Sequence, residues 1–224
     1  MTFRSNDDGP GAAGFHRETV RRQILAAALP HVPFDGWTAA TLAQSAVEAG
    51  HPATTALRVF PGGPIQAVEF WCADCDRAMV AALEALGPEA MKIRERIAKA
   101  VRLRLEAVAA HREAVRRALG LLALPHNAPV AARTLWRTVD AAWYAAGDTA
   151  TDFNWYTKRG LLAGVYGATL IYWLDDKSAG FADTWAFLDR RIADVMRVPK
   201  ALGDIAKRLG DLPNPFRPFR PRGL

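Results

Sequence analysis

The sequence has no apolar run approaching the roughly 18 residues that would span a bilayer. Its first fifteen residues mix Gly, Asp, Ser and Pro and lack the apolar stretch of a secretory signal. These absences predict a cytoplasmic protein, with a peripheral place on the inner face of the cytoplasmic membrane as the alternative. Residues 1–16 show no periodicity either, so we expect this segment to be disordered.

Cysteine is scarce as well, because Cys72 and Cys75 are the only two. A single C-x-x-C lacks the second pair of ligands of a structural zinc site. Since they stand three residues apart on an expected helix, the two side chains should pack or face solvent. The five histidines have no metal-ligand spacing, and Glu48 with His51 supplies only half of a di-iron pattern. We therefore expect no metal site.

Motifs of catalysis are missing too. The sequence contains no phosphate-binding Gly-rich loop, no dinucleotide fingerprint and no nucleophile elbow. One route to catalysis stays open, an active site assembled from residues far apart in the sequence, which spacing does not reveal. We predict that the chain is not an enzyme and has no catalytic residues of its own.

Hydrophobic residues, by contrast, make up half of the chain, and they recur at helical spacing. No alternating run bounded by turn residues indicates a strand. The pattern predicts an all-α protein of about nine helices, with antiparallel neighbours because the connections are short. The expected helices cover residues 17–29, 38–49, 52–60, 65–87, 93–108, 112–124, 130–146, 151–174 and 181–196. Residues 200–209 can form one more short helix.

The first sixty residues resemble the N-terminal helix-turn-helix module of a TetR-type regulator. The likeness lies in one helix, a turn at Gly36 and Trp37, the run LAQSAVEAG at residues 42–50, and a short helix that reaches Phe60. The resemblance implies a TetR-like fold, in which three N-terminal helices precede a helical ligand-binding bundle.

The charge of this module argues against DNA as a partner. A DNA-binding module normally has a basic surface, yet residues 17–70 carry four arginines against four acidic residues. The expected recognition helix offers only Arg58, with His51 beside it. The positive charge lies in residues 90–138, which hold eleven Lys and Arg against three acidic residues, and in residues 197–224. A ligand-responsive transcriptional regulator remains the alternative function.

Three glycines, Gly160, Gly164 and Gly167, fall within one expected helix. Each costs about 0.5–1 kcal/mol relative to alanine in a helix interior, so their presence needs a reason. Either another helix packs very closely, or they leave room for something that is not protein. Residues 160–174 carry no charge, and we expect a fully buried helix that lines a cavity.

The most specific resemblance lies in the same part of the chain. The runs TDFNWYTKR (151–159) and DTWAFLDRRI (183–192) resemble the ubiquinone-biosynthesis accessory family known as the ninth Coq protein. GWTAATLAQSAVEAG (36–50) and VFPGG (59–63) fit the N-terminal part of that family. The resemblance covers most of residues 20–196. It implies a TetR-like fold, an internal lipid pocket, assistance to the demethoxyubiquinone hydroxylase, and a homodimer.

The resemblance implies that an isoprenoid quinone intermediate, or another isoprenoid lipid, is the bound group, so no further cofactor is expected. We expect the helices of residues 130–196 to line the pocket. The candidate lipid-binding side chains are apolar: Leu161, Leu162, Val165, Leu170 and Trp173.

A hydroxylase-docking patch is also implied by the resemblance, at the positions of Asp152, Trp155, Tyr156 and Arg159, with Ala142 one helix earlier. Other members can carry a larger apolar residue at position 142, and alanine departs from that pattern. From the residues alone, three aromatics between 153 and 156 cannot all face one core, so at least one should be exposed. The alternative is that all three fill the core between helices.

Members of the family tend to end in an amphipathic helix that touches the bilayer. This chain instead ends in FRPFRPRGL (216–224), whose Phe and Arg side chains suit an anionic lipid surface; a solvated tail is the alternative. We therefore divide the chain into a disordered N-terminus (1–16), a degenerate helix-turn-helix-like module (17–62), a helical lipid-binding domain (63–198) and a basic tail (199–224).

Overall fold

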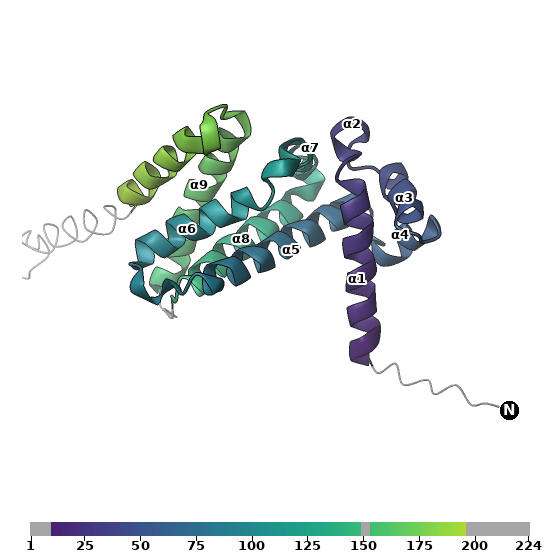
Figure 1. The fold of residues 1–224 in the computed structure, drawn as a ribbon, viewed down its shortest axis with the longest axis horizontal. Coiled ribbons are helices and arrows are strands. Elements are labelled where there is room, and N and C mark those ends of the chain that lie inside the picture. Colours follow the sequence, from purple (N-terminus) through teal and green to yellow (C-terminus); the bar gives the residue numbers. More distant parts are fainter. Residues whose placement is uncertain (1–9, 149–152, 196–224) are drawn as a thin grey trace, which may run out of the picture.

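The computed structural model describes residues 10–148 and 153–195, and the regular elements in this part of the chain are all helical (Figure 1). The all-α prediction is confirmed. The helices are α1 (Pro10–Ala28), α2 (Val32–Asp35), α3 (Ala39–Glu48), α4 (Thr54–Val59), α5 (Pro64–Ala85), α6 (Ile93–Glu106), α7 (Arg112–Leu122), α8 (Ala128–Ala145) and α9 (Phe153–Asp175), followed by helical residues 182–195. Among them, none has both the length and the apolarity needed to cross a membrane.

Helices α1 to α4 form the N-terminal module, in which α1 packs on α3 and α3 on α4. The helices of this module begin and end at capping residues and glycines that are visible in the sequence. Thr38 caps α3, since its Oγ1 accepts a hydrogen bond from the backbone N–H of Thr41 at 3.0 Å. Gly36 and Gly50 adopt positive φ angles of 71° and 80°, which glycine tolerates better than other residues.

The start of α1 corrects one expectation. Residues 10–16 were expected to be disordered, but the described helix already includes Pro10. A proline suits the first turn of a helix because its φ is already helical and its missing N–H would have no partner there. The remainder of that segment, residues 1–9, lies outside the described residues.

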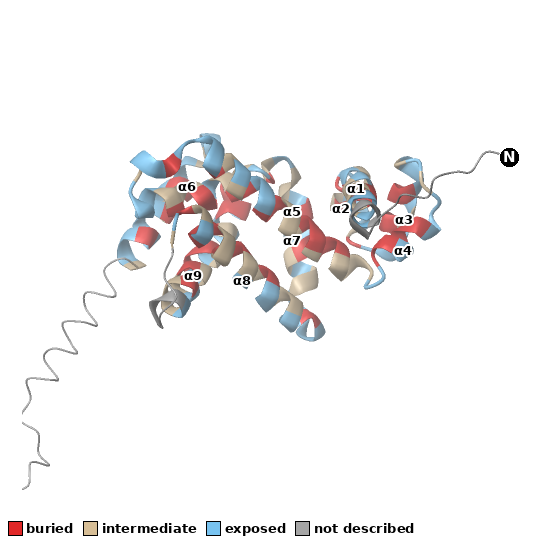
Figure 2. Ribbon diagram, turned by 90° about the horizontal axis from the view of Figure 1, so that it is seen from below, coloured by how far each residue is buried: buried red, intermediate tan, exposed pale blue. Residues whose placement is uncertain are grey.

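Helices α5 to α9 form the second unit, with α5 packed between α6 and α8 and with α9 against α8. Figure 2 shows the buried residues along the facing sides of these helices and the exposed ones along the outer sides. The largest fully buried side chains of this unit include Met79, Leu83 and Leu105. A bundle of this kind encloses a space between helix faces, and that space contains the site described below.

One continuous core joins the module to the bundle. Trp37, from the turn before α3, is buried and donates a hydrogen bond from Nε1 to the carbonyl of Ala114 on α7 at 3.1 Å. On the outside, Arg22 of α1 reaches Asp74 of α5 at 2.9 Å. The two parts are therefore tied by both apolar and polar contacts.

The chain turns sharply after α9, around the carboxylate of Asp176. Its Oδ1 accepts hydrogen bonds from the backbone N and the hydroxyl of Ser178, and its Oδ2 accepts two from Thr184. On the other side of the corner, Arg112 donates hydrogen bonds to the carbonyls of Trp173 and Asp176. These hydrogen bonds fix the direction in which residues 182–195 continue after α9.

Helix α9 is not the fully buried helix that we expected. Gly160 and Gly164 are exposed, and no atom beyond the adjacent residues and the backbone of α9 itself lies within 4 Å of where a Cβ would stand on any of its three glycines. Ile171 on the same helix is 65% exposed. An uncharged sequence shows only that burial would cost little, whereas the neighbouring helices decide which face is covered. The other face, with Thr169 and Trp173, is buried completely.

Candidate functional site: an apolar cavity with a polar closed end

A cavity of about 360 Å³ lies within the bundle, between α5, α6, α7, α8 and α9. Most of its lining is aliphatic or aromatic, which is the usual character of a ligand pocket. The lining residues are Trp71, Cys72, Cys75, Arg104, Leu105, Val108, Val115, Ala118, Leu119, Leu122, Ala123, Ala131, Thr134, Leu135, Thr138, Tyr166, Gly167, Leu170 and Ile171. Such a space can accommodate an apolar molecule, or the apolar part of a larger one.

The cavity has a closed end and an open end, which differ in exposure. At the open end, Ala123 after α7 and Ile171 on α9 are exposed to solvent. Residues of the closed end, such as Cys75, Leu105 and Tyr166, are buried. A ligand would therefore enter between α7, α8 and α9 and extend inward toward α5 and α6.

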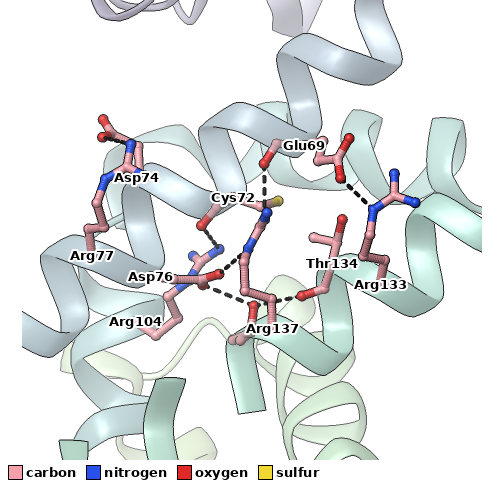
Figure 3. Close-up of polar contacts among 10 residues, drawn as sticks. Glu69, Cys72, Asp74, Asp76, Arg77, Arg104, Arg133, Thr134 and Arg137 are labelled. Carbon is pink, nitrogen blue, oxygen red and sulfur yellow. Dashed lines mark hydrogen bonds and ion pairs between the residues drawn. The ribbon is translucent and has the colours of Figure 1, made fainter. Parts of the chain in front are cut away.

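A buried ion-pair network forms the floor of the closed end (Figure 3). The carboxylate of Asp76 on α5 accepts hydrogen bonds from Nε of Arg104 at 2.8 Å and from the hydroxyl of Thr138 at 2.9 Å. Nε of Arg137 approaches the same carboxylate from the outer side at 3.3 Å. Because Asp76 and Arg104 are both nearly inaccessible to solvent, these partners compensate for charges that would otherwise be costly to bury.

The ionisable groups beside this network keep their protons. Burial raises the pKa of the Tyr166 hydroxyl to about 12 and that of the Cys75 thiol to about 11, and it raises the pKa of Cys72 as well. Burial also opposes the charge of Arg104, but the neighbouring Asp76 carboxylate raises its pKa, so the guanidinium stays charged. The thiols are therefore unreactive apolar lining rather than nucleophiles.

The structure places only one of the five expected lipid-binding residues on the cavity. Leu170 lines it. Leu162, Val165 and Trp173 are buried elsewhere in the core, and Leu161 is half-buried away from the cavity. The reason is the helical period, because the face of α9 with Tyr166, Gly167, Leu170 and Ile171 turns toward the cavity and a different face carries the other candidates.

The expected docking residues divide in a similar way. Tyr156 is 63% exposed, and its ring centroid lies 6.2 Å from that of Trp136 on α8. Ala142 and Arg159 are buried, at 2% and 3% exposure, so neither can be a direct contact of a partner. The side chains of Asp152 and Trp155 lie outside the described residues.

Arg159 acts instead within the protein. Its Nε donates to Asp140 on α8 at 2.6 Å, and its Nη1 donates to Asp148 at 3.3 Å. Lys158 also pairs with Asp148, at 2.8 Å. These contacts hold the first turns of α9 against the end of α8, and so they fix where Tyr156 is displayed.

An exposed aromatic surface surrounds that position. Trp136, Asp140 and Tyr144 follow one another at four-residue spacing along α8, and Tyr144 is 71% exposed. Together with Tyr156 they form what we call the α8–α9 aromatic patch. Exposed aromatic side chains of this kind are common anchors in protein interfaces.

The polar residues of the cavity were missed from the sequence. Arg104 and Asp76 stand beside apolar stripes in their helices, as most solvated residues do, and no local pattern separates the two cases. Glu48 and His51, which were rejected as a metal site, bond instead to His31 and Gln23 at the surface. Within the described residues, no three His, Cys, Asp or Glu side chains gather as metal ligands would.

The family models and the related proteins that match this chain carry the same name, COQ9. The family model described as COQ9 matches residues 128–199, and the model described as "Ubiquinone biosynthesis protein COQ9, N-terminal domain" matches residues 18–47. The mitochondrial ubiquinone biosynthesis protein COQ9 of Rattus norvegicus is 37% identical over 199 residues, which cover 86% of this chain and 62% of that protein. The human protein of the same name is 36% identical, with 86% and 61% covered. COQ9-B of Xenopus laevis is 34% identical, with 84% and 67% covered.

The chain thus spans about three fifths of the length of the two mammalian relatives. The names of these relatives place them in mitochondria, so they lend no support to the expectation of a cytoplasmic protein. Among solved structures, a TetR transcriptional regulator from Nitrosomonas europaea has a TM-score of 0.66 and 20% identity, covering 80% of this chain and 98% of that one. The predicted TetR-like fold is confirmed.

Proposed function

Since the chain belongs to the COQ9 family of ubiquinone biosynthesis proteins, we propose that it serves that pathway as a lipid-binding accessory protein. It holds an isoprenoid quinone intermediate in the cavity and presents it to the demethoxyubiquinone hydroxylase. The chain itself performs no chemistry. The observation that carries the proposal is the cavity of about 360 Å³ with an almost entirely apolar lining.

The physical argument for lipid binding is the transfer of apolar surface. An isoprenoid tail gains about 25 cal/mol for each Å² of apolar surface removed from water, and the walls offer it side chains such as Leu119, Leu135 and Leu170. The exposed open end between α7, α8 and α9 gives a long tail a way out, so the whole lipid need not fit inside.

The α8–α9 aromatic patch supports the second half of the proposal. It lies on the outer side of the helices that carry the cavity wall, so a partner that docks there is close to the bound molecule. The buried ion pairs of Arg159 hold the patch in a fixed geometry, which lowers the entropic cost of docking. Tyr156, Tyr144 and Trp136 are the proposed direct contacts.

Mass spectrometry of the purified protein tests the lipid proposal. We expect an isoprenoid lipid to be extracted from the full chain after purification from cells. Ala131→Trp should reduce the lipid content several-fold, because Ala131 lines the open end of the cavity and the larger ring would fill it. Ala132→Trp is the matched control, since Ala132 is the next residue of α8 but is exposed and does not line the cavity.

Two results would contradict the proposal. One is protein that is repeatedly empty of lipid when isolated under mild conditions. The other is equal lipid content in Ala131→Trp, Ala132→Trp and the unchanged chain, which would place any bound lipid outside the cavity.

A further inference from the structure

Arg96 of α6 donates hydrogen bonds to three backbone carbonyls in two separate turns of the chain. Its Nε donates to the carbonyl of Met91 at 2.9 Å, and its Nη2 donates to that of Glu89 at 2.9 Å, both between α5 and α6. Its Nη1 donates to the carbonyl of Ala146, at the end of α8, at 3.1 Å. All three guanidinium nitrogens therefore bind backbone, and the side chain joins the start of α6 to the end of α8.

The end of α8 is a tight turn that depends on Gly147. The N–H of Gly147 donates to the carbonyl of Tyr144 at 2.9 Å. The N–H of Asp148 donates to the carbonyl of Trp143 at 3.1 Å. Two such bonds form the Schellman motif, in which a glycine with positive φ ends a helix, and the φ of Gly147 is 85°. A Cβ at this position would lie 3.1 Å from Nη1 of Arg96, so the guanidinium packs closely on the turn.

The same turn presents the carboxylate of Asp148 to α9. Its Oδ1 accepts a hydrogen bond from Nζ of Lys158 at 2.8 Å, and its Oδ2 accepts one from Nη1 of Arg159 at 3.3 Å. Trp143 adds a third contact, since its Nε1 donates to the carbonyl of Lys158 at 3.2 Å. The side chains of Asp148 and Arg159 are only 6% and 4% exposed, so water and salt screen this ion pair less than a surface pair.

We propose that Arg96 is a positioning residue for the α8–α9 aromatic patch. It fixes the turn at the end of α8, the turn fixes Asp148, and Asp148 fixes the first turns of α9, where Tyr156 is exposed. Arg96 itself lies outside the patch and does not contact the partner. The proposal rests on the proposed function, in which the patch docks the hydroxylase, and it adds a residue on a third helix on which docking depends.

Arginine suits this position better than lysine would. The last carbonyls of a helix have no partner within the helix and carry partial negative charge, so a cation at this end is favourable. A guanidinium also offers several donors in a rigid planar arrangement, whereas an ammonium is a single compact charge on a flexible stem. Only the guanidinium can bind carbonyls on both sides at once. We therefore expect lysine at position 96 to preserve part of the effect and glutamine to preserve less.

Binding of the purified hydroxylase to the full chain tests the positioning role. We expect Arg96→Gln to weaken binding about three- to tenfold, the equivalent of roughly one hydrogen bond, and Arg96→Lys to weaken it less. Gly147→Ala should act like Arg96→Gln, because a Cβ strains the same turn. Lipid content should stay that of the unchanged chain, since neither residue lines the cavity.

A double-mutant cycle distinguishes positioning from direct contact. If Arg96 acts through the placement of Tyr156, Arg96→Gln should weaken docking much less in a Tyr156→Ala background than in the unchanged chain. Additive losses would mean that the two residues act independently, and they would overturn the proposal.

Amide hydrogen exchange measures the same effect without a partner. In Arg96→Gln, residues 156–160 of α9 should exchange about tenfold faster, because the turn that holds them has lost its support. Residues 66–76 of α5 should exchange as they do in the unchanged chain. Unchanged exchange at residues 156–160 would overturn the proposal even if docking weakened.

Matched controls come from neighbouring surface positions. Arg94→Gln removes an exposed arginine of α6 whose ion pair, with the adjacent Glu95, has a distance of 3.9 Å. Gly120→Ala replaces an exposed glycine of α7 where an added Cβ would have open space around it. Neither substitution should change docking or the exchange of residues 156–160.

Two further results have a definite meaning. Faster exchange in α5 together with loss of lipid in Arg96→Gln would show that Arg96 supports the whole bundle, and the positioning role would be overturned. If the hydroxylase did not bind the unchanged chain, the proposed docking would fail, and the role of Arg96 in docking would fail with it. The exchange of residues 156–160 would then still decide whether Arg96 holds the start of α9.

Discussion

Arg159 and Tyr156 lie three positions apart on α9, yet burial gives them different roles. Tyr156 is exposed to solvent, whereas Arg159 is buried in ion pairs with Asp140 and Asp148. Under the proposed function, a change at either position would weaken docking of the hydroxylase. For Arg159 the cause would be the loss of the ion pairs that position the start of α9, rather than the loss of a contact with the partner. A role carried over from a family motif therefore has to be checked against the exposure of the side chain.

Asp76 is a residue whose removal should cost the bundle much of its stability. Asp76→Ala would leave the guanidinium of Arg104 buried without its carboxylate, and breaking a buried pair in this way costs about 3–5 kcal/mol. We expect urea denaturation to show a loss of that size in the free energy of unfolding. Asp74→Ala is the control, because Asp74 pairs at the surface with Arg22 and Arg77, and surface pairs contribute about 0–1 kcal/mol. Equal losses in both variants would contradict the structural role of the network.

At the scale of elements, α9 carries three different surfaces. One face, with Thr169 and Trp173, belongs to the core, a second lines the cavity, and a third, with Gly160 and Gly164, is open to solvent. A single helix can serve all three because side chains project at about 100° intervals around its axis. The glycines, which we expected to make room for a ligand, mostly face outward, and only Gly167 lines the cavity.

The hydrogen bonds of Asp176, between α9 and residues 182–195, should make the free energy of unfolding depend on pH in the acid range. Burial opposes ionisation of Asp176, but hydrogen bonds from Ser178 and Thr184 outweigh it and hold the pKa of the carboxyl well below its ordinary value. A lowered folded-state pKa contributes stability above the pKa of the unfolded chain, near 4, and that contribution is lost as the pH falls further. Asp176→Asn should therefore be less stable than the unchanged chain at pH 7, with a gap that narrows from about pH 4 downward.

Thermal unfolding followed by circular dichroism at a series of pH values measures that gap. Asp175→Asn is the matched control, because Asp175 is the preceding residue and is exposed, and its ion pair within the described residues is with Arg116. A gap for Asp176→Asn that stays constant between pH 7 and pH 2 would show that the hydrogen bonds do not depend on the charge.

At the scale of the whole molecule, the fold has the helical framework of a TetR regulator. The apolar cavity and the α8–α9 aromatic patch both lie in the second unit, helices α5 to α9. The short helix α4, at the place of a recognition helix, exposes Leu57 beside Arg58. The charge argument against DNA stays a prediction. Fold likeness alone does not decide function, because the same framework carries unrelated sites.

Docking is tested by substitution in the α8–α9 aromatic patch. Tyr156→Lys should weaken binding to the purified hydroxylase at least tenfold, since an exposed aromatic anchor is replaced by a hydrated charge. Lipid content and melting temperature should remain those of the unchanged chain. Phe34→Lys is the control, because Phe34 is 85% exposed and belongs to α2 of the N-terminal module, outside the α8–α9 aromatic patch (Figure 1). Loss of lipid along with the partner would mean that Tyr156 supports the bundle instead.

The sequence by itself determined the helical class, the positions of the breaks and the family. Helical period, caps and glycines are local signals, which explains why Thr38 and Gly36 mark the start of α3 correctly. Spacing shows which residues share a face of a helix but not what that face meets. Only the packing of five helices decided that Arg104, Thr134 and Tyr166 converge on one floor, and that the exposed end of the cavity lies opposite to them.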